Sequence, residues 1–287
     1  MNHQDRGTWD IKGVRELASI VDECRAADED AILGAVHPIM GAKGSEKKSD
    51  DEEEDIRVRA VFTAPRANTL SGLEVNALYD EVSASPISFQ GSRTLRAYAA
   101  LKGYIISSRD AKSADLQSKL RRENSDDPRT FVALPRSFWP AEWEGKYTNP
   151  MVPLILSLYG HPVAGNRWDK KMDASAREVG VVPAPGWKSI YRNCGRNEHG
   201  KTCVGEGAAM GVYVDDFEIA ATPADTPKLC VELAKKIEFG DDYKIWDNDS
   251  STAHLGVDYK VKATPQKNCG SKMTVRSEMG DYCRDLV

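Results

Sequence analysis

The sequence predicts a mixed fold of the α+β class. Several segments repeat apolar residues at the i, i+3, i+4 spacing of a helix, and others alternate apolar and polar residues as strands do. Helical and strand-like segments do not follow each other in the regular order of a parallel βαβ protein, and no internal repeat is present. A chain of 287 residues can bury a sizeable core, in one large domain or in two subdomains.

The N-terminal part is expected to be a helix followed by a loop. Residues 9–31 place apolar side chains on one helical face, at Val14, Leu17, Ile20, Val21 and Cys24. Residues 43–55 ("KGSEKKSDDEEED") contain no apolar side chain and predict a solvated, mobile loop, with a partner-binding insert as the alternative. Residues 1–55 are therefore expected to form a helical lead-in and an acidic loop.

Strand and helix patterns follow this loop. Residues 56–64 alternate as a strand, which places Arg57 and Arg59 on one face. Residues 93–104 have helical spacing, and residues 104–110 form an apolar strand directly after them.

The second half of the chain predicts an irregular stretch, two helices and several strands. Residues 134–150 are rich in Pro and Trp and are expected to be irregular. Residues 166–180 predict an amphipathic helix closed by a glycine, and residues 222–239 predict a helix with Thr and Pro near its start. Residues 253–263 alternate as another strand.

The segment "GVYVDDFEIA" (residues 211–220) predicts a hairpin with Asp215 and Asp216 at its turn. Asp is a common turn residue, so these residues alone favour a plain turn. The alternative is a metal site, because adjacent carboxylates can hold divalent cations. Asp110 ends the strand at residues 104–110 and can supply a third carboxylate, although in isolation it reads as a surface strand terminator.

Composition limits the function classes. The net charge of −5 gives no general support for nucleic-acid binding, because such domains are usually basic. The six cysteines are scattered and are expected to be free thiols. The start of the chain lacks a signal-peptide pattern, and the best apolar run (residues 152–160) is too short to span a membrane. We therefore expect an intracellular protein, cytoplasmic or nuclear, that is not attached to a membrane.

A family resemblance emerges from the order of the motifs. The segment "YVDDF" (residues 213–217) resembles the Tyr-x-Asp-Asp box of reverse transcriptases. Other segments are similar, in the same order, to those of the reverse transcriptase of Ty1/copia-type retrotransposon polyproteins: "RVRAVF" (57–62), "RDAKSADLQ" (109–117), "LYGHPVAGNRW" (158–168) and "HLGVDYKV" (254–261).

This resemblance implies the fingers and palm of a right-hand polymerase, with a central antiparallel sheet backed by helices. Residues 56–262 would form the fingers and palm. Residues 263–287 would begin a connection toward a thumb that is largely missing. The implied activity is RNA-directed DNA polymerisation with Mg²⁺ or Mn²⁺ as cofactor. The implied partners are deoxynucleoside triphosphates and an RNA or DNA template with its primer.

The resemblance also implies roles for single residues. Asp110, Asp215 and Asp216 would be the catalytic carboxylates and metal ligands. Substrate contacts would come from Arg57 and Arg59 at the triphosphate, Gly160 near the nascent base pair and Tyr213 behind the primer end. The alternatives for these four residues are exposed strand charges, a simple turn glycine and a packed strand aromatic.

Asp115 departs from the family pattern. The family has Phe or Tyr five residues after the first catalytic Asp, where the ring packs under the sugar of the incoming nucleotide. Asp115 cannot stack on a sugar, so nucleotide selection is expected to be degraded. The alternative function is therefore a catalytically degraded retrotransposon remnant that acts at most as a weak nucleic-acid-binding protein.

Two other residue groups favour a structural interpretation. Trp139, Trp143 and Trp168 can stack on bases, but core packing is favoured. Cys194, His199 and Cys203 lack a fourth zinc ligand, so a loop is favoured over a zinc site.

Overall fold

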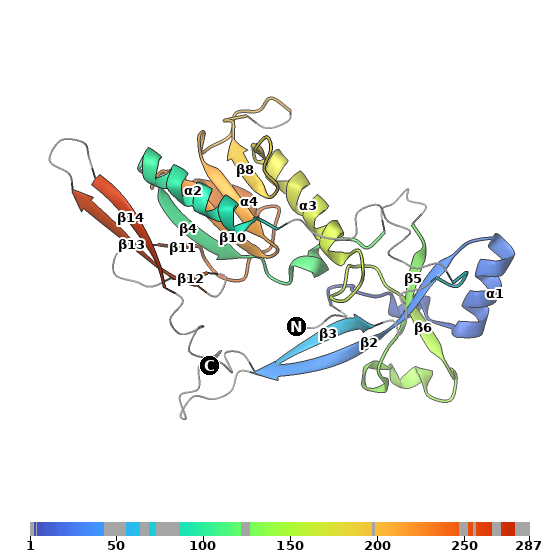
Figure 1. Cartoon of the computed structure of the whole chain (residues 1–287). Helices are drawn as coiled ribbons and strands as arrows, with labels where there is room; N and C mark the ends of the chain where they lie inside the picture. The colour runs from blue at the N-terminus through green and yellow to red at the C-terminus, as the bar shows by residue number, and fades with distance from the viewer. Residues whose placement is uncertain are drawn as a thin grey trace. The chain divides into compact units, whose positions relative to one another are not determined.

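Figure 1 shows the computed structural model of the chain, which describes residue 3 and residues 5–42, 56–63, 69–72, 86–121, 127–196, 199–246, 252–254, 257–265 and 271–278. Contacts divide the chain into two compact units, each built from two stretches of sequence. Unit 1 comprises Met1–Ser83 and Asp115–Trp168, and unit 2 comprises Ala84–Ala114 and Asp169–Val287. Helices and strands are mixed along the chain, so the predicted mixed α and β class is confirmed.

Unit 1 is centred on a five-stranded sheet with the order β1-β6-β5-β2-β3. Strands β2 and β5 pair in parallel, and the other neighbours pair antiparallel. The predicted strand at residues 56–64 is confirmed as β3, whereas β2, β5 and β6 were not predicted. The strands are β1 (Arg15–Glu16), β2 (Ala31–Ala42), β3 (Ile56–Thr63), β5 (Arg129–Ala133) and β6 (Pro150–Pro153).

Only the middle of the helix predicted over residues 9–31 is helical, as α1 (Leu17–Ala27). A 3₁₀ turn (Ile11–Gly13) and strand β1 precede it, and β1 pairs with β6. Asp28 ends the helix in a left-handed conformation with φ of 52°. The prediction was wrong at both ends because strand pairing with distant segments overrides local helical spacing.

Strand β2 separates two apolar cores, because alternate residues of a strand point to opposite faces. Ile32 and Val36 belong to the larger core of unit 1. Ala31 lies in a second core with Ile20 and Cys24 of α1. This arrangement explains why the helical face of α1 is apolar.

Unit 2 contains a six-stranded sheet with the order β11-β4-β10-β9-β8-β7, in which all neighbouring strands pair antiparallel. The predicted strand before Asp110 and the predicted hairpin are confirmed as β4, β9 and β10. The strands are β4 (Ile105–Asp110), β7 (Val181–Pro183), β8 (Ile190–Asn193), β9 (Ala209–Tyr213), β10 (Asp216–Ala221) and β11 (Lys244–Ile245).

A separate three-stranded sheet follows in sequence, with the order β12-β13-β14. The single strand predicted over residues 253–263 is instead two strands that pair antiparallel, with His254 opposite Val257. The strands are β12 (Thr252–His254), β13 (Val257–Pro265) and β14 (Ser271–Glu278).

The helices α2 (Phe89–Lys102), α3 (Ala164–Glu178) and α4 (Thr226–Ala234) match predicted helices, with shifted ends. The Ser88 side chain accepts a hydrogen bond from the Gly91 backbone N–H and caps α2, so this helix begins earlier than predicted. Helix α4 ends before Phe239, whose ring packs edge-on against Phe217 of the sheet at 5.2 Å between centroids. None of the described helices has both the length and the apolar character needed to cross a membrane.

The register of the six-stranded sheet defines what each face carries. Ile106, Ala209 and Ala220 are cross-strand neighbours and pack in one core with Leu95 and Ala99 of α2. This face is covered by α2, as Figure 1 shows. Every second residue along the strands shares it, so Asp110, Tyr213, Asp216 and Glu218 are on the α2 face.

Candidate functional site

The predicted hairpin has its turn one residue earlier than expected. Tyr213 pairs with Asp216, so the two loop residues are Val214 and Asp215, and Asp216 is the first residue of β10. Val214 has φ of 57°. A positive φ at the first loop residue is the pattern of a type II′ turn, which normally takes glycine there. A β-branched residue in this conformation is strained, and such strain clusters at functional sites.

The structure brings the three predicted carboxylate residues to one end of two adjacent strands. Asp216 on β10 lies directly opposite Asp110 on β4. The backbone N–H of Ala111 donates to the backbone carbonyl of Asp215 at 2.8 Å, which ties the turn to the end of β4. Directly opposed residues of an antiparallel pair point to the same face, so Asp110 and Asp216 are neighbours there.

Asp216 has a perturbed acidity. Burial, the Asp215 carboxylate and the Asp110 carboxylate, in that order, raise the pKa of Asp216 to about 6. Each of these three causes disfavours the ionised form. The three acidic groups therefore interact electrostatically, and a bound cation would offset the repulsion between them.

The donor set fits a hard divalent cation. Mg²⁺ prefers carboxylate oxygens and is often held by one or two carboxylates together with substrate phosphates and water. Among the described residues, no three or more His, Cys, Asp or Glu side chains form a ready-made cage for a metal ion. Asp110 and Asp215 could bind Mg²⁺ or Mn²⁺ only together with other ligands such as phosphates and water, and this role stays a prediction.

Tyr213 is placed at the edge of this cluster. It lies directly opposite Asp216 across the hairpin, and its side chain is 41% exposed. The alternative of a strand aromatic packed in a core therefore does not apply. The ring can contact a ligand that approaches the carboxylates.

Arg59 is exposed on β3 in unit 1, and its guanidinium carbon lies 6.0 Å from the centroid of the Tyr159 ring. Arg57 lies on the same strand, two residues earlier and therefore on the same face, but its side chain is outside the described residues. The strand predicted for both is confirmed, and their contact with a triphosphate stays a prediction.

Gly160 has a clear structural requirement within unit 1. Its φ is 87°, and a Cβ atom there would lie 2.3 Å from the backbone carbonyl oxygen of Phe62. The Phe62 N–H also donates to the Tyr159 carbonyl at 2.7 Å. Gly160 therefore allows a close approach to strand β3, and its position near a nascent base pair stays a prediction.

The rest of the "LYG" segment packs inside unit 1. Leu158 and Trp168 are fully buried. His161 is buried with its Nε2 3.3 Å from the Thr130 hydroxyl oxygen. Burial, and secondarily the charge of Arg167, lower the pKa of His161 to about 4, so this imidazole is neutral at pH 7.

Asp115 is also in unit 1, within a 3₁₀ turn at Ala114–Gln117. Only 8% of this residue is exposed. Its backbone carbonyl accepts hydrogen bonds from the N–H and the hydroxyl of Ser118 at 3.1 and 2.9 Å. Asp115 is therefore a buried acidic residue at the position where the resembled family has an aromatic ring.

Core packing is confirmed for two of the tryptophans. Trp143 and Trp168 are buried, and Trp139 is half-buried with its indole N–H donating to the Leu134 carbonyl.

The predicted free thiols are also confirmed for the cysteines in the described part of the chain, which are Cys24, Cys194, Cys203 and Cys230.

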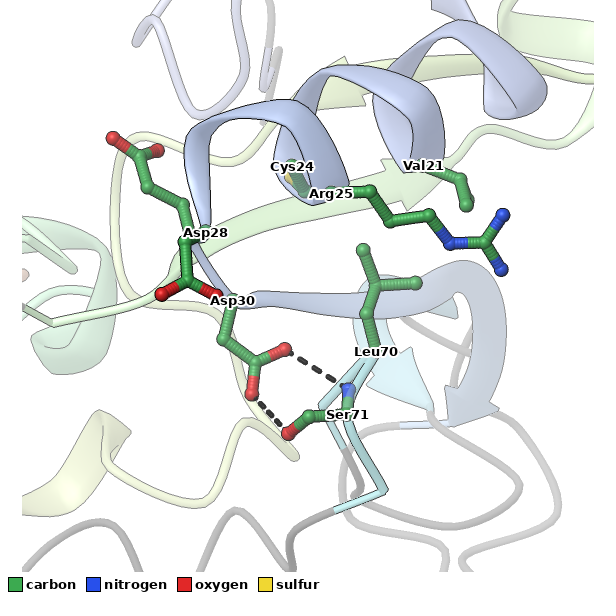
Figure 2. Close-up of a pocket in the computed structure, with 8 residues that line it drawn as sticks. Val21, Cys24, Arg25, Asp28, Asp30, Leu70 and Ser71 are labelled. Atoms are coloured by element: carbon green, nitrogen blue, oxygen red, sulfur yellow. Dashed lines mark hydrogen bonds between the residues drawn. The ribbon is translucent and has the colours of Figure 1, made fainter.

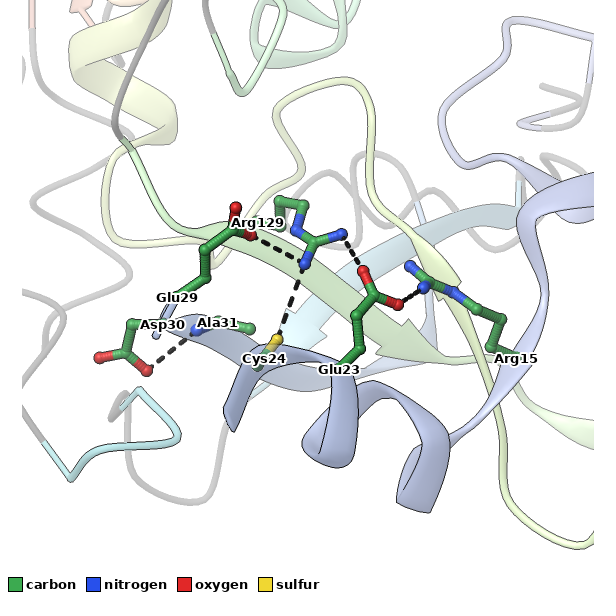
Figure 3. Close-up of polar contacts among 7 residues, drawn as sticks. All are labelled: Arg15, Glu23, Cys24, Glu29, Asp30, Ala31 and Arg129. Atoms are coloured by element: carbon green, nitrogen blue, oxygen red, sulfur yellow. Dashed lines mark hydrogen bonds and ion pairs between the residues drawn. The ribbon is translucent and has the colours of Figure 1, made fainter. Parts of the chain in front are cut away.

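A pocket of about 510 Å³ opens beside the C-terminal end of α1 in unit 1 (Figure 2). Two acidic residues that line it, Asp30 and Glu29, make hydrogen bonds or ion pairs with other residues of unit 1. Figure 2 shows the Asp30 carboxylate accepting from the N–H and the hydroxyl of Ser71. Figure 3 shows Arg129 paired with Glu23 and Glu29. The Glu23–Arg129 pair joins α1 to β5, and the Asp30–Ser71 contact joins the start of β2 to the loop at Ser71, so these carboxylates have structural partners.

One functional element escaped sequence reasoning. Glu218 follows Asp216 by two residues on β10 and is 2% exposed. Its carboxylate accepts two hydrogen bonds from Arg96 of α2, at 2.7 and 3.0 Å. A glutamate inside the apolar run "FEIAA" was the available signal, because a buried charge requires a partner.

Comparisons with known proteins do not assign the chain to a family: no family model matches it, and no curated protein matches it.

Proposed function

We propose that this chain is an RNA-directed DNA polymerase of the Ty1/copia retrotransposon type. It would add deoxynucleotides to a primer annealed to an RNA or DNA template, inside the cell, in the cytoplasm or the nucleus. The observation that carries the proposal is the gathering of Asp110, Asp215 and Asp216 at the end of β4 and the β9–β10 turn.

The proposed reaction is attack of the primer 3′-hydroxyl on the α-phosphate of the nucleotide, with pyrophosphate leaving. Mg²⁺ or Mn²⁺, when bound, would lower the pKa of that hydroxyl and neutralise phosphate charge. Asp110 and Asp215 would hold the ions, and Asp216 would complete the acidic site. Tyr213 would contact the primer end, while Arg57 and Arg59 would contact the triphosphate.

The architecture of unit 2 supports the assignment of a palm. Carboxylates of a polymerase palm sit on an antiparallel sheet backed by helices, and here β4, β10 and β9 are adjacent antiparallel strands with α2 packed on them. The strained Val214 turn adds support, because backbone strain clusters at functional sites and this half-buried turn carries two carboxylates. Unit 1, with the ribbon of β2 and β3, would supply the fingers.

Asp115 favours a second candidate function. A buried acidic side chain at the sugar-selecting position is incompatible with stacking on deoxyribose. In this second proposal the chain is a degraded remnant that binds nucleic acid weakly and does not polymerise.

Primer extension on an RNA template separates the two proposals. The full chain is assayed with Mg²⁺ and with Mn²⁺, beside Asp215→Asn and the control Asp242→Asn, an exposed aspartate of unit 2 outside the cluster. Polymerase function requires extension by the wild type and by Asp242→Asn, and loss of at least about a hundredfold in Asp215→Asn. If no extension occurs at any concentration of either metal ion, the polymerase proposal fails and the remnant proposal stands.

A further inference from the structure

A buried polar network lies under the carboxylate cluster. Glu218 accepts from Arg96 through both of its oxygens, and its Oε2 also accepts from the Ser92 hydroxyl at 2.9 Å. The exposed fractions of the Arg96 and Glu218 side chains are 9% and 2%. Two parallel N–H···O bonds fix the relative orientation of a guanidinium and a carboxylate, which a single contact does not.

The network extends from Arg96 to strand β4. The Arg96 guanidinium carbon lies 5.0 Å from the centroid of the Trp246 ring. The indole N–H of Trp246 donates to the Ser108 hydroxyl at 3.0 Å, and its backbone N–H donates to the Ile106 carbonyl at 2.9 Å. One arginine of α2 is thus linked to both strands that carry the acidic cluster.

The register places this network one step from the cluster. Glu218 lies opposite Ser108, and the next opposed pair on the same face is Asp216 and Asp110. If β10 slipped by two residues against β4, each side chain would keep its face but Glu218 would oppose Asp110. Such a slip would separate Glu218 from Arg96 and break a buried ion pair, which is costly.

Stability alone does not account for an ion pair at this position. A well-packed apolar pair of similar volume is often as stable as a buried ion pair, because it needs no desolvation of charge. Buried ionic groups are better attested as devices that select one register or one arrangement. The neighbouring position is closely packed, since a Cβ on Gly211, opposite Glu218, would lie 2.6 Å from Ile87 Cδ1.

We propose that Arg96 is a positioning residue that, through Glu218 and Trp246, holds Asp216 opposite Asp110 in the arrangement needed to bind a divalent cation. The proposal deepens the polymerase assignment and rests on it for the identity of the cation. Arg96 acts through Glu218 and Trp246, and it is not placed among the groups that touch substrate.

The test measures cation binding and stability separately. The wild-type chain is compared with the paired variant Arg96→Met/Glu218→Leu. The control is Lys235→Met/Glu232→Leu, which removes an exposed ion pair at the C-terminal end of α4 in the same unit. Mn²⁺ affinity is read from the electron paramagnetic resonance signal of free Mn²⁺, without nucleic acid. Unfolding midpoints are measured on the same samples.

We expect the variant Arg96→Met/Glu218→Leu to have an unfolding midpoint close to that of wild type, while its Mn²⁺ dissociation constant rises about tenfold or more, the usual effect of losing a group that orients metal ligands. The α4 pair should change neither quantity. Arg96→Lys keeps the positive charge but loses the two parallel N–H donors of the guanidinium, so it should also weaken Mn²⁺ binding. This variant tests the proposal if Arg96→Met/Glu218→Leu does not fold.

Unchanged Mn²⁺ affinity in the folded apolar pair, or in Arg96→Lys, overturns the positioning role. Wild type that does not bind Mn²⁺ also overturns it, whatever primer extension gives. Wild type that binds Mn²⁺, loses that binding in the variants and extends no primer refutes the polymerase proposal and leaves the positioning role intact.

Discussion

Asp110 and Asp216 lie directly opposite each other on β4 and β10, and the Asp110 carboxylate helps to raise the pKa of Asp216. Two opposed acidic residues destabilise an antiparallel pair. The backbone hydrogen bonds between β4 and β10 do not depend on the identity of these two side chains. Repulsion between the two carboxylates therefore lowers the stability of the folded chain, and a cation bound between them would offset that repulsion.

The first prediction concerns Asp216 and pH. The pKa of Asp216 is about 6 in the folded chain, against 3.8 as the ordinary value, so the folded state holds this proton more tightly. The free energy of unfolding therefore falls as pH rises from about 4 to about 6, and the loss persists above that range. Asp216→Asn removes this loss and should be more stable than wild type at pH 7.5 by at most about 3 kcal/mol.

Urea denaturation at pH 4 and pH 7.5 checks this expectation. The two proteins should converge at pH 4, and Mg²⁺ should narrow the gap at pH 7.5 by stabilising the wild type more than Asp216→Asn, which has one carboxylate fewer. Asp242→Asn is the control for simple loss of an exposed carboxylate. Equal free energies of unfolding for wild type and Asp216→Asn at pH 7.5 would show that the ionised Asp216 carboxylate does not destabilise the fold.

The second prediction concerns the turn residue Val214. A non-glycine residue in a sparsely populated positive-φ conformation costs on the order of 1–3 kcal/mol, and glycine restores about 0.5–1 kcal/mol of chain entropy to the unfolded state. Val214→Gly should therefore raise the free energy of unfolding by about 1 kcal/mol. Val212→Gly, at a buried position of β9, should lower it by about 3 kcal/mol. A destabilised Val214→Gly would mean that Val214 makes contacts worth more than its strain.

The third prediction separates strain from crowding at Gly160. Both Gly160 and Gly145 have positive φ, at 87° and 73°, but a Cβ on Gly145 would meet nothing within 4 Å. Gly145→Ala should cost about 1 kcal/mol, which is the backbone penalty alone. Gly160→Ala should cost about 3 kcal/mol or more, because the Phe62 carbonyl must also move. Thermal and urea unfolding of the two variants will show the difference, and similar losses would refute the close contact.

The fourth prediction is a thermodynamic cycle on Arg96 and Glu218. Arg96→Met leaves the Glu218 carboxylate buried without a counter-charge and should lower the free energy of unfolding by about 3–5 kcal/mol. The paired variant Arg96→Met/Glu218→Leu should recover most of that loss. Additive losses from the two single variants would instead show that the ion pair is not coupled.

Local sequence patterns predicted the helices and strands whose apolar residues are spaced so that one face is buried. The strand before Asp110, the hairpin around Asp215 and the helix that became α2 were all found in order, because alternation and helical spacing report the face that each segment buries. The strands β2, β5 and β6 escaped, because they are stabilised by pairing between segments far apart in the chain.

The sequence by itself determined which carboxylates can form the site: Asp215 and Asp216 in the acidic hairpin, and Asp110 at a strand end. Only the tertiary structure decided that the turn falls at Val214 and Asp215, that Asp216 faces Asp110, and that Arg96 holds Glu218. The pairing of Asp216 with Asp110 and of Glu218 with Arg96 joins segments more than a hundred residues apart, and no local sequence pattern encodes such pairing.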